Sequence, residues 1–235
     1  MLKNKELISN NESKPEVIQL FSKDEIQKFV DLYDTLPVTR NNKLQKVIKK
    51  RWLQNYNKEL DSFYSEKLKS VLGDFKMDNL KDEDGLDIFG LFQESHLPLK
   101  LHVDSGFYDE NVIYKQTLVP LTPYGETIIY KNRWYGRSTN FTIDEKELSN
   151  KSEKTIGKNV VSDLHNKMFG NKTFNKEHHN NYLRHENIEN LKGLEVEKIY
   201  KWKIGEILIF DRTHLHSSSC NITSKKLGLT TFTKK

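Results

Sequence analysis

The chain has 235 residues, of which 35% are hydrophobic and 30% charged, with a formal net charge of +5. This length fits one domain with a buried core, so we expect a single domain over residues 1–235. The only cysteine, Cys220, excludes an intrachain disulfide, and no apolar run is long enough to cross a bilayer. We therefore expect a cytoplasmic protein without a membrane partner. The lysines are spread along the whole chain, which disfavours nucleic acid as a partner.

The N-terminal part of the chain predicts a flexible tail followed by two helices. Residues 1–15 alternate charged and polar residues, and we expect them to be the tail. Ser22 and Glu25 form a capping box that begins a helix, and Pro37 lies beyond its end. A second apolar stripe at helical spacing ends at Gly73 and consists of Leu53, Tyr56, Leu60, Phe63, Tyr64, Leu68, Val71 and Leu72.

From residue 86 the pattern changes to short runs rich in Ile, Leu, Phe, Tyr and Thr, which predict strands. These runs are LDIFGLFQ, LKLHVD, KQTLVPL, ETIIYK, KIYKWK, EILIFD and LGLTTF. Their number is typical of a double-stranded β-helix, so we expect a mainly β, cupin-like jelly roll with supporting N-terminal α-helices. The polar stretch 140–198 predicts a long insertion or lid, with helices at 160–169 and 176–183.

His102 and Asp104 are two residues apart in a predicted strand, so both side chains should leave the same face. A histidine from EILIFDRTHLHSSS, which we treat as one strand, would complete a set of two imidazoles and one carboxylate. Such a set leaves metal positions open and suits non-haem iron(II). Both His214 and His216 are candidates. We favour His216 as the metal ligand and expect His214 to be a supporting residue.

A hairpin centred on Asn221 would place His216 opposite Lys226, because 221 − 216 and 226 − 221 are both 5. The Lys226 ammonium would then point into the cavity beside the metal, where a buried cation needs an anionic partner. The far carboxylate of a 2-oxo dicarboxylic acid that chelates iron would provide that partner. The neighbouring Lys225 remains an alternative anchor.

Four segments together resemble the Fe(II)/2-oxoglutarate-dependent dioxygenase superfamily, particularly its phytanoyl-CoA dioxygenase-like and prolyl 4-hydroxylase-like branches. They are HVD at 102–104, TLVPLTPYGETIIY at 117–130, GEILIFDRTHLHSSS at 205–219 and KKLGLTTF at 225–232. The resemblance implies Fe(II) on His102, Asp104 and His216, with 2-oxoglutarate and dioxygen as co-substrates and ascorbate as a stimulant. It also implies Lys226 as the residue that binds oxoglutarate. Gln93, nine residues before His102 on the preceding predicted strand, and Thr117 are further candidate contacts, although an ordinary polar strand position explains Gln93 equally well. Tyr124 stands where the family often has glycine, and Lys226 where many members have arginine.

The resemblance implies that 2-oxoglutarate is decarboxylated to succinate while a substrate, which we expect to be a small polar molecule, is hydroxylated. Arg133, Trp134 and Arg137 are candidate substrate contacts, although a solvated hairpin explains them equally well. The alternatives are a protein or peptide hydroxylase, a basic nucleic-acid-binding protein or nucleobase demethylase, and a non-catalytic cupin. A second metal site on the insertion histidines His178, His179 and His185 is disfavoured, because no orderly ligand spacing accompanies them.

Overall fold

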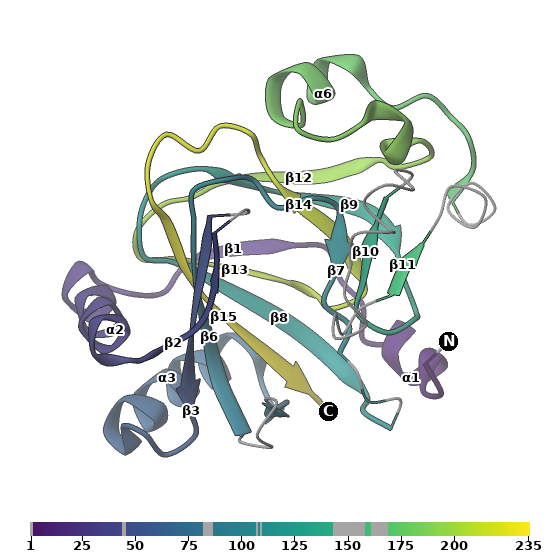
Figure 1. Cartoon of the computed structure of the whole chain (residues 1–235). Helices are drawn as coiled ribbons and strands as arrows, with labels where there is room; N and C mark the ends of the chain where they lie inside the picture. Colours follow the sequence, from purple (N-terminus) through teal and green to yellow (C-terminus); the bar gives the residue numbers. More distant parts are fainter. Residues whose placement is uncertain are drawn as a thin grey trace.

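Two β-sheets face each other in the computed structural model of the chain (Figure 1). The structure describes residues 2–43, 46–81, 87–106, 108, 110–142, 158–160 and 169–235. The nine-stranded sheet has the order β1 (Glu16–Gln19), β13 (Glu206–Asp211), β8 (Ile113–Pro120), β15 (Lys226–Lys234), β6 (Asp87–Ser95), β3 (Val47–Leu53) and β2 (Val38–Asn42), with β4 (Lys76–Met77) beside β15 and β5 (Leu80–Lys81) beside β6. The six-stranded sheet has the order β11 (Lys158–Val160), β10 (Thr139–Phe141), β7 (His102–Val103), β14 (His214–Ser218), β9 (Glu126–Arg133) and β12 (Val196–Lys201). The predicted jelly-roll class is confirmed.

Helices α2 (Lys23–Thr35) and α3 (Lys58–Leu72) cover the outer face of the nine-stranded sheet (Figure 1). The predicted capping box is present, because the Ser22 hydroxyl accepts from the Glu25 amide at 3.1 Å while the Glu25 carboxylate accepts from the Ser22 amide at 2.8 Å. The second helix begins later than its apolar stripe predicts. Leu53 is the last residue of β3, and Asn57 caps the helix. The N-terminal strands β1, β2 and β3 were not expected.

The N-terminal residues differ from the expected flexible tail. Helix α1 (Lys5–Ser9) lies within them, and the side chains of Leu2 and Ile8 are buried against Ile113 of β8. The Ser13 amide donates to the Asp211 carboxylate at 2.9 Å. Burial of apolar side chains and a hydrogen bond to a buried carboxylate together order a segment whose sequence is mostly polar.

The described part of the predicted insertion packs on the outer face of the six-stranded sheet. It contains α6 (Lys176–Tyr182) and the short 3-10 helix η1 (Ile188–Leu191), and the expected helix at 176–183 is confirmed. Its apolar side chains, Phe174, Leu183, Leu191 and Leu194, join a cluster with residues of β7, β9, β10 and β14. The expected helix at 160–169 falls mostly outside the described residues. Within the described ranges, the helices are too short or too polar to span a bilayer.

The segment 205–219, expected to be one strand, is divided between the two sheets. Strand β13 belongs to the nine-stranded sheet, whereas β14 crosses to the six-stranded sheet. The predicted hairpin pairing of His216 with Lys226 is therefore wrong. His216 pairs with His102 and with Ile129, and Lys226 pairs with Ser95. Both side chains still enter the space between the sheets, because each lies on the inner face of its own sheet.

Candidate active site

Three side chains meet between the sheets at one end of an apolar cluster that includes Leu118, Ile129 and Phe210. The register of β7 and β14 places His102 directly beside His216, with ring centroids 4.2 Å apart. Asp104 follows the end of β7. Its Oδ2 atom lies 3.8 Å from Nε2 of His102 and 3.4 Å from Nε2 of His216.

Both histidines, His102 and His216, direct their Nε2 atom toward Asp104. Nδ1 of His102 lies 2.7 Å from the Lys100 carbonyl, and Nδ1 of His216 lies 3.1 Å from the His214 carbonyl. A carbonyl only accepts, so each Nδ1 carries the proton and donates it. Each Nε2 therefore has a free lone pair directed at the same point as the carboxylate. Backbone acceptors of this kind are the usual partners that orient metal-binding imidazoles.

Two residues hold Asp104 in place, Gln116 of β8 and Arg212, which directly follows β13. Nε2 of Gln116 donates to Oδ2 of Asp104 at 3.1 Å, and the guanidinium of Arg212 donates to the Asp104 carbonyl at 3.3 Å. Oε1 of Gln116 is buried and has no hydrogen-bond partner among the described residues. Buried polar atoms are rarely left unpaired, so this oxygen indicates that the site is built to receive a further donor.

The protonation states fit metal binding. Burial, reinforced by the neighbouring His216, lowers the pKa of His102 to about 4, so its imidazole is neutral at physiological pH. Burial alone would raise the pKa of Asp104, but the neighbouring His216 and His102 lower it below its usual range. Neutral imidazoles and an ionised carboxylate are the forms that bind a divalent ion without first losing protons.

The spacing of the three groups also fits a shared ion. Their ligand atoms all lie within 4.8 Å of one another, and bonds of about 2.0–2.2 Å to one ion bring neighbouring ligand atoms to about 3 Å. Small side-chain rotations close that difference. In the described part of the chain, no other group of His, Cys, Asp or Glu has this arrangement. His102, Asp104 and His216 are thus the residues that could hold a metal here.

Lys226 is a second unusual feature of the same interior. Its side chain is buried, and its ammonium donates to the Glu126 carbonyl at 3.0 Å and to the Ser218 hydroxyl at 3.1 Å, 4.4 Å from the centre of the Trp202 ring. No carboxylate forms an ion pair with it among the residues described. Burial lowers the pKa of Lys226 to about 7, although the charge of Glu126 opposes this shift. An anion arriving here would restore the charged form.

The two residues left open by the sequence, His214 and Lys225, are engaged elsewhere. Nδ1 of His214 accepts from the Asp211 amide at 3.1 Å, and its Nε2 lies 3.1 Å from the Glu197 carboxylate. Burial, with Arg133 nearby, lowers the pKa of His214 to about 2. Both ring nitrogens are therefore occupied in a neutral ring. The side chain of Lys225 is 46% exposed and lies 3.9 Å from Glu94 on the helix-covered face.

Gln93 and Thr117 lie on opposite faces of the nine-stranded sheet. Gln93 faces inward, because its neighbours Phe92 and Glu94 point to the helices, and its amide donates to the Ser95 hydroxyl at 3.2 Å. Thr117 faces outward, where its hydroxyl bonds Thr231 beneath α3. The predicted contact of Thr117 with an oxoacid is corrected accordingly. Gln116 is the residue of β8 that enters the site, and strand alternation was the signal that could have found it.

The predicted substrate residues after β9 are not assembled around the metal ligands. The Arg133 guanidinium binds the Asp211 carboxylate at 2.5 Å and the Ser13 carbonyl at 3.0 Å, so it ties the N-terminal segment to the sheet. Trp134 packs edge-on against Phe141 in the cluster outside the six-stranded sheet. Arg137 is exposed, and its carbonyl accepts from the Trp134 indole at 2.9 Å. These contacts give Arg133 and Trp134 structural roles, and a contact with substrate stays a prediction.

The insertion histidines do not form a metal site among the described residues. Nε2 of His179 lies 3.0 Å from the Glu186 carbonyl, and Nε2 of His185 lies 3.4 Å from the Leu99 carbonyl. His178 lies in the first turn of α6, where its amide donates to the Asn175 side chain. The three imidazoles thus have separate surroundings.

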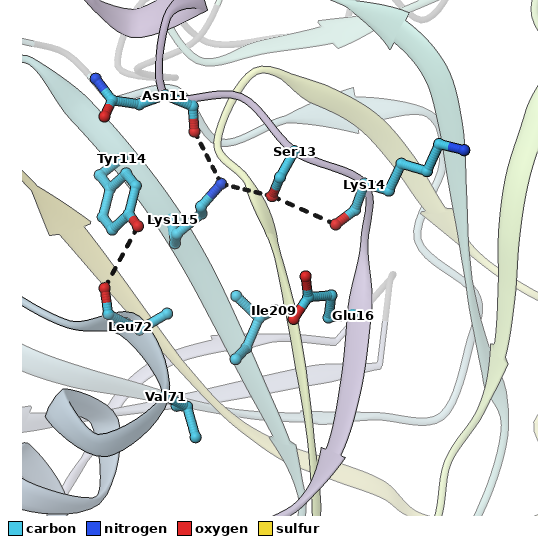
Figure 2. Close-up of a pocket in the computed structure, with 9 residues that line it drawn as sticks. All are labelled: Asn11, Ser13, Lys14, Glu16, Val71, Leu72, Tyr114, Lys115 and Ile209. Carbon is cyan, nitrogen blue, oxygen red and sulfur yellow. Dashed lines mark hydrogen bonds between the residues drawn. The ribbon is translucent and has the colours of Figure 1, made fainter.

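A separate cavity of about 180 Å³ lies on the outer face of the nine-stranded sheet, between the N-terminal segment, α3, β8 and β13 (Figure 2). The figure shows Lys115 reaching the Asn11 carbonyl and the Ser13 hydroxyl. The same ammonium is paired with Asp211. None of the three clustered ligands lines this cavity, and its lysine is already satisfied, so we assign it no part in the site.

No protein-family model matches the chain, and no curated protein matches it. Solved structures do. The epimerase SnoN, in complex with Fe3+, alpha ketoglutarate and nogalamycin RO, aligns with a TM-score of 0.52 and 7% identity over 98% of this chain and 83% of that chain. The non-heme alpha ketoglutarate dependent carbocyclase SnoK, from nogalamycin biosynthesis, aligns with a TM-score of 0.52 and 10% identity over 98% of this chain and 84% of that chain. The chain therefore has the fold of these alpha ketoglutarate dependent enzymes.

Proposed function

We propose that the chain is an Fe(II)- and 2-oxoglutarate-dependent dioxygenase that hydroxylates a small polar molecule while 2-oxoglutarate is decarboxylated to succinate. One observation carries the proposal. Two imidazole Nε2 atoms and one carboxylate converge on a single point, and a buried lysine without a carboxylate partner lies in the same interior. The fold supports it, because SnoN with the same fold is described in complex with Fe3+ and alpha ketoglutarate.

The three ligand residues have distinct tasks in this proposal. His102 and His216 would bind iron through Nε2, while their Nδ1 protons remain on backbone carbonyls that fix the ring orientation. Asp104 would supply the single anionic ligand, held by Gln116. A set of two histidines and one carboxylate leaves positions open for an oxoacid and dioxygen. Iron and oxoacid, when bound, would activate dioxygen, which is the oxidant that breaks the C–H bond.

Lys226 would bind the far carboxylate of 2-oxoglutarate. A dicarboxylate chelated at the metal presents its second carboxylate away from the ion, and the Lys226 ammonium lies on the inner face of the opposite sheet. The Ser218 hydroxyl, which already contacts the ammonium, can donate to the same carboxylate. Gln93 lies on the same inner face and is a further proposed contact. The indole of Trp202 shields the ion pair from water and thereby strengthens it.

Three further statements stay predictions. We propose that residues 1–235 act as one dioxygenase domain, that the segment 140–198 closes over the substrate, and that the protein works in the cytoplasm. The free cysteine, Cys220, is compatible with a reducing compartment.

The test is oxoglutarate turnover. The purified protein is supplied with Fe(II), ascorbate and carboxyl-labelled 2-oxoglutarate in air, with and without pooled small metabolites, and labelled carbon dioxide and succinate are measured. We expect both products in equal amounts, stimulated by one of the pools, and neither product with His216→Ala. Stimulation by peptides alone would point to a peptide hydroxylase. Absence of succinate under every condition would indicate a non-catalytic cupin.

A further inference from the structure

A second cation, Lys49 on β3, faces the same interior as the metal ligands. Lys49 pairs with Gln93 of β6, and Gln93 pairs in turn with Gly228 of β15, so all three lie on the inner face. A Cβ at Gly228 would touch Trp202 and Leu118 of the interior cluster, which confirms that the paired residues Lys49, Gln93 and Gly228 face the interior.

The next residue along the strand shows the contrast. Lys50 points to the helix-covered face, where its ammonium donates to the Tyr33 carbonyl at 2.7 Å and lies 4.1 Å from the centre of the Tyr33 ring. Lys50 is thus a satisfied structural lysine. The two adjacent lysines of this strand therefore have opposite environments, and of the two only Lys49 faces the interior.

Lys49 is half-buried, and its ammonium makes no hydrogen bond and no ion pair within the ranges that the structure describes. It lies close enough to Asp104 and His102 to act on both electrostatically, without bonding either. A cation in such a position is stabilised weakly, because burial removes water and nothing replaces it.

Other cations surround Lys49 rather than neutralise it. Arg40 of β2 pairs directly with Lys49 across the strands, and Arg51 lies two residues further along the same face of β3. Both guanidiniums disfavour the charged form of Lys49 and oppose the effect of Asp104. Among the carboxylates of the described residues, Asp104 is the one that favours the charged form of Lys49.

The free carboxylate of 2-oxoglutarate cannot pair with both Lys226 and Lys49. Lys226 pairs with Ser95, two residues along β6 from Gln93, so Gln93 separates the two lysines on the inner face. An oxoacid that chelates the metal has one free carboxylate, which Lys226 takes. Lys49 remains without an anion.

We propose that the primary substrate carries an anionic group, a carboxylate or a phosphate, and that Lys49 binds it, with Arg40 at the rim. The inference rests on the proposed function, since it assigns the oxoacid to Lys226. An ion pair between Lys49 and the substrate anion would hold the rest of the molecule over the metal ligands. A charge-assisted contact at a half-buried position also selects against neutral analogues, because these would leave the ammonium unpaired.

The test measures binding without turnover. The protein is loaded with Zn(II), which has no redox chemistry, and with saturating 2-oxoglutarate. A panel of small carboxylic acids and phosphate monoesters, each matched with its primary amide or parent alcohol, is titrated by calorimetry and ligand-observed NMR. Wild type, Lys49→Gln, Lys49→Arg and Lys50→Gln are compared, with thermal unfolding of each variant as the folding control.

We expect at least one acid or phosphate to bind wild type and Lys50→Gln about tenfold or more tightly than its neutral counterpart. Lys49→Gln should lose that preference, and Lys49→Arg should keep most of it. The carboxylate and phosphate arms identify which anion is preferred. Equal binding of charged and neutral partners across the panel, or an unchanged preference in Lys49→Gln, would overturn the inference.

The same titrations separate this inference from the proposed function. If wild type fails to bind 2-oxoglutarate in the presence of Zn(II), the proposed function fails, whatever the panel shows. If Lys49→Gln loses affinity for 2-oxoglutarate while Lys226→Met keeps it, Lys49 is the oxoacid anchor and the inference is overturned. An unchanged oxoglutarate affinity in Lys49→Gln supports the assignment.

Discussion

Two buried lysines on neighbouring strands of the nine-stranded sheet have opposite surroundings. Lys115 of β8 is paired with Asp211, and its ammonium also reaches the Ser13 hydroxyl at 2.8 Å. Lys226 of β15 has only a carbonyl, a hydroxyl and an aromatic ring around it. The first lysine is part of a closed network, whereas the second lacks a carboxylate partner among the described residues.

The same contrast holds for the whole regions around these lysines. Around Asp211, the donors Lys115, Arg133 and the Ser13 amide all meet acceptors within the chain. Between the sheets, two imidazole lone pairs and the carbonyl oxygen of the Gln116 side chain lack such partners. A buried network that satisfies itself contributes to folding, whereas one that is left incomplete is a candidate for ligand binding. Substitutions in the two regions should therefore have different consequences.

The largest effect is expected for Asp211→Ala. Removing this carboxylate leaves Lys115 and Arg133 without their anionic partner, and breaking a buried ion pair in this way costs about 3 to 5 kcal/mol. Urea unfolding followed by circular dichroism measures the free energy of unfolding. Asp104→Ala is the matched control and should cost much less stability. Similar losses in both variants would remove the distinction between the regions.

Metal affinity should show the reverse order. Asp104→Ala removes the only anionic ligand, so affinity for Zn(II) or Fe(II) should fall by more than the roughly 10- to 100-fold that is typical of losing a supporting hydrogen bond. Isothermal titration calorimetry measures this affinity, and wild type should bind one ion. His214→Gln, in which the ligands themselves are intact, should retain the affinity far better than His216→Gln. Equal losses at positions 214 and 216 would contradict the ligand assignment.

Lys226→Met should weaken 2-oxoglutarate binding by about 2 to 4 kcal/mol, because the buried carboxylate of the oxoacid is left without its cation. Its effect on metal affinity should be small. Lys225→Met is the matched control, since its ammonium lies near Glu94 on the other face. Competition calorimetry in the presence of Zn(II) reads both affinities. A larger loss in the Lys225 variant would move the anchor to that residue.

The smallest effect, measured over one pH unit, is a pH dependence of stability that comes from Lys226. Its pKa is about 7 in the folded protein and near 10.5 when unfolded, so between these values the unfolded state binds one more proton. Stability should therefore rise with pH across this window, by at most about 1.4 kcal/mol per pH unit from this group. The contribution should be absent from Lys226→Met. Identical pH profiles of unfolding for the two proteins would contradict the buried, unpaired state of this lysine.

Features of the fold and the site that depend only on residues close together in the chain could be predicted from the sequence. The capping box of α2 and the two-residue spacing of His102 and Asp104 are local, and the structure has both. Their combination with His216 and Lys226 came from the ordered motifs of a resemblance, and the structure brings these residues into one interior. The assignment of their roles stays a prediction.

What the sequence could not predict depends on pairing between distant strands. The division of 205–219 between two sheets invalidated the hairpin argument for Lys226, although the side chain still enters the site. The choice between Gln116 and Thr117 depends on which face of β8 meets the helices, and a shift of one residue reverses it. Arg133 was a candidate substrate contact, with a solvated hairpin as the equal alternative, and its ion pair with Asp211 could not be predicted because the two residues are far apart in the chain.

The most direct test is the visible spectrum of the protein with Fe(II) and 2-oxoglutarate in the absence of oxygen. Chelation of ferrous iron by a 2-oxo acid produces a charge-transfer band that neither component shows alone. If His102, Asp104 and His216 hold one iron beside Lys226, the band should appear in wild type at one equivalent of Fe(II), disappear in His216→Ala, and require far more oxoglutarate in Lys226→Met. No band in wild type, or an unchanged band in His216→Ala, would contradict the account.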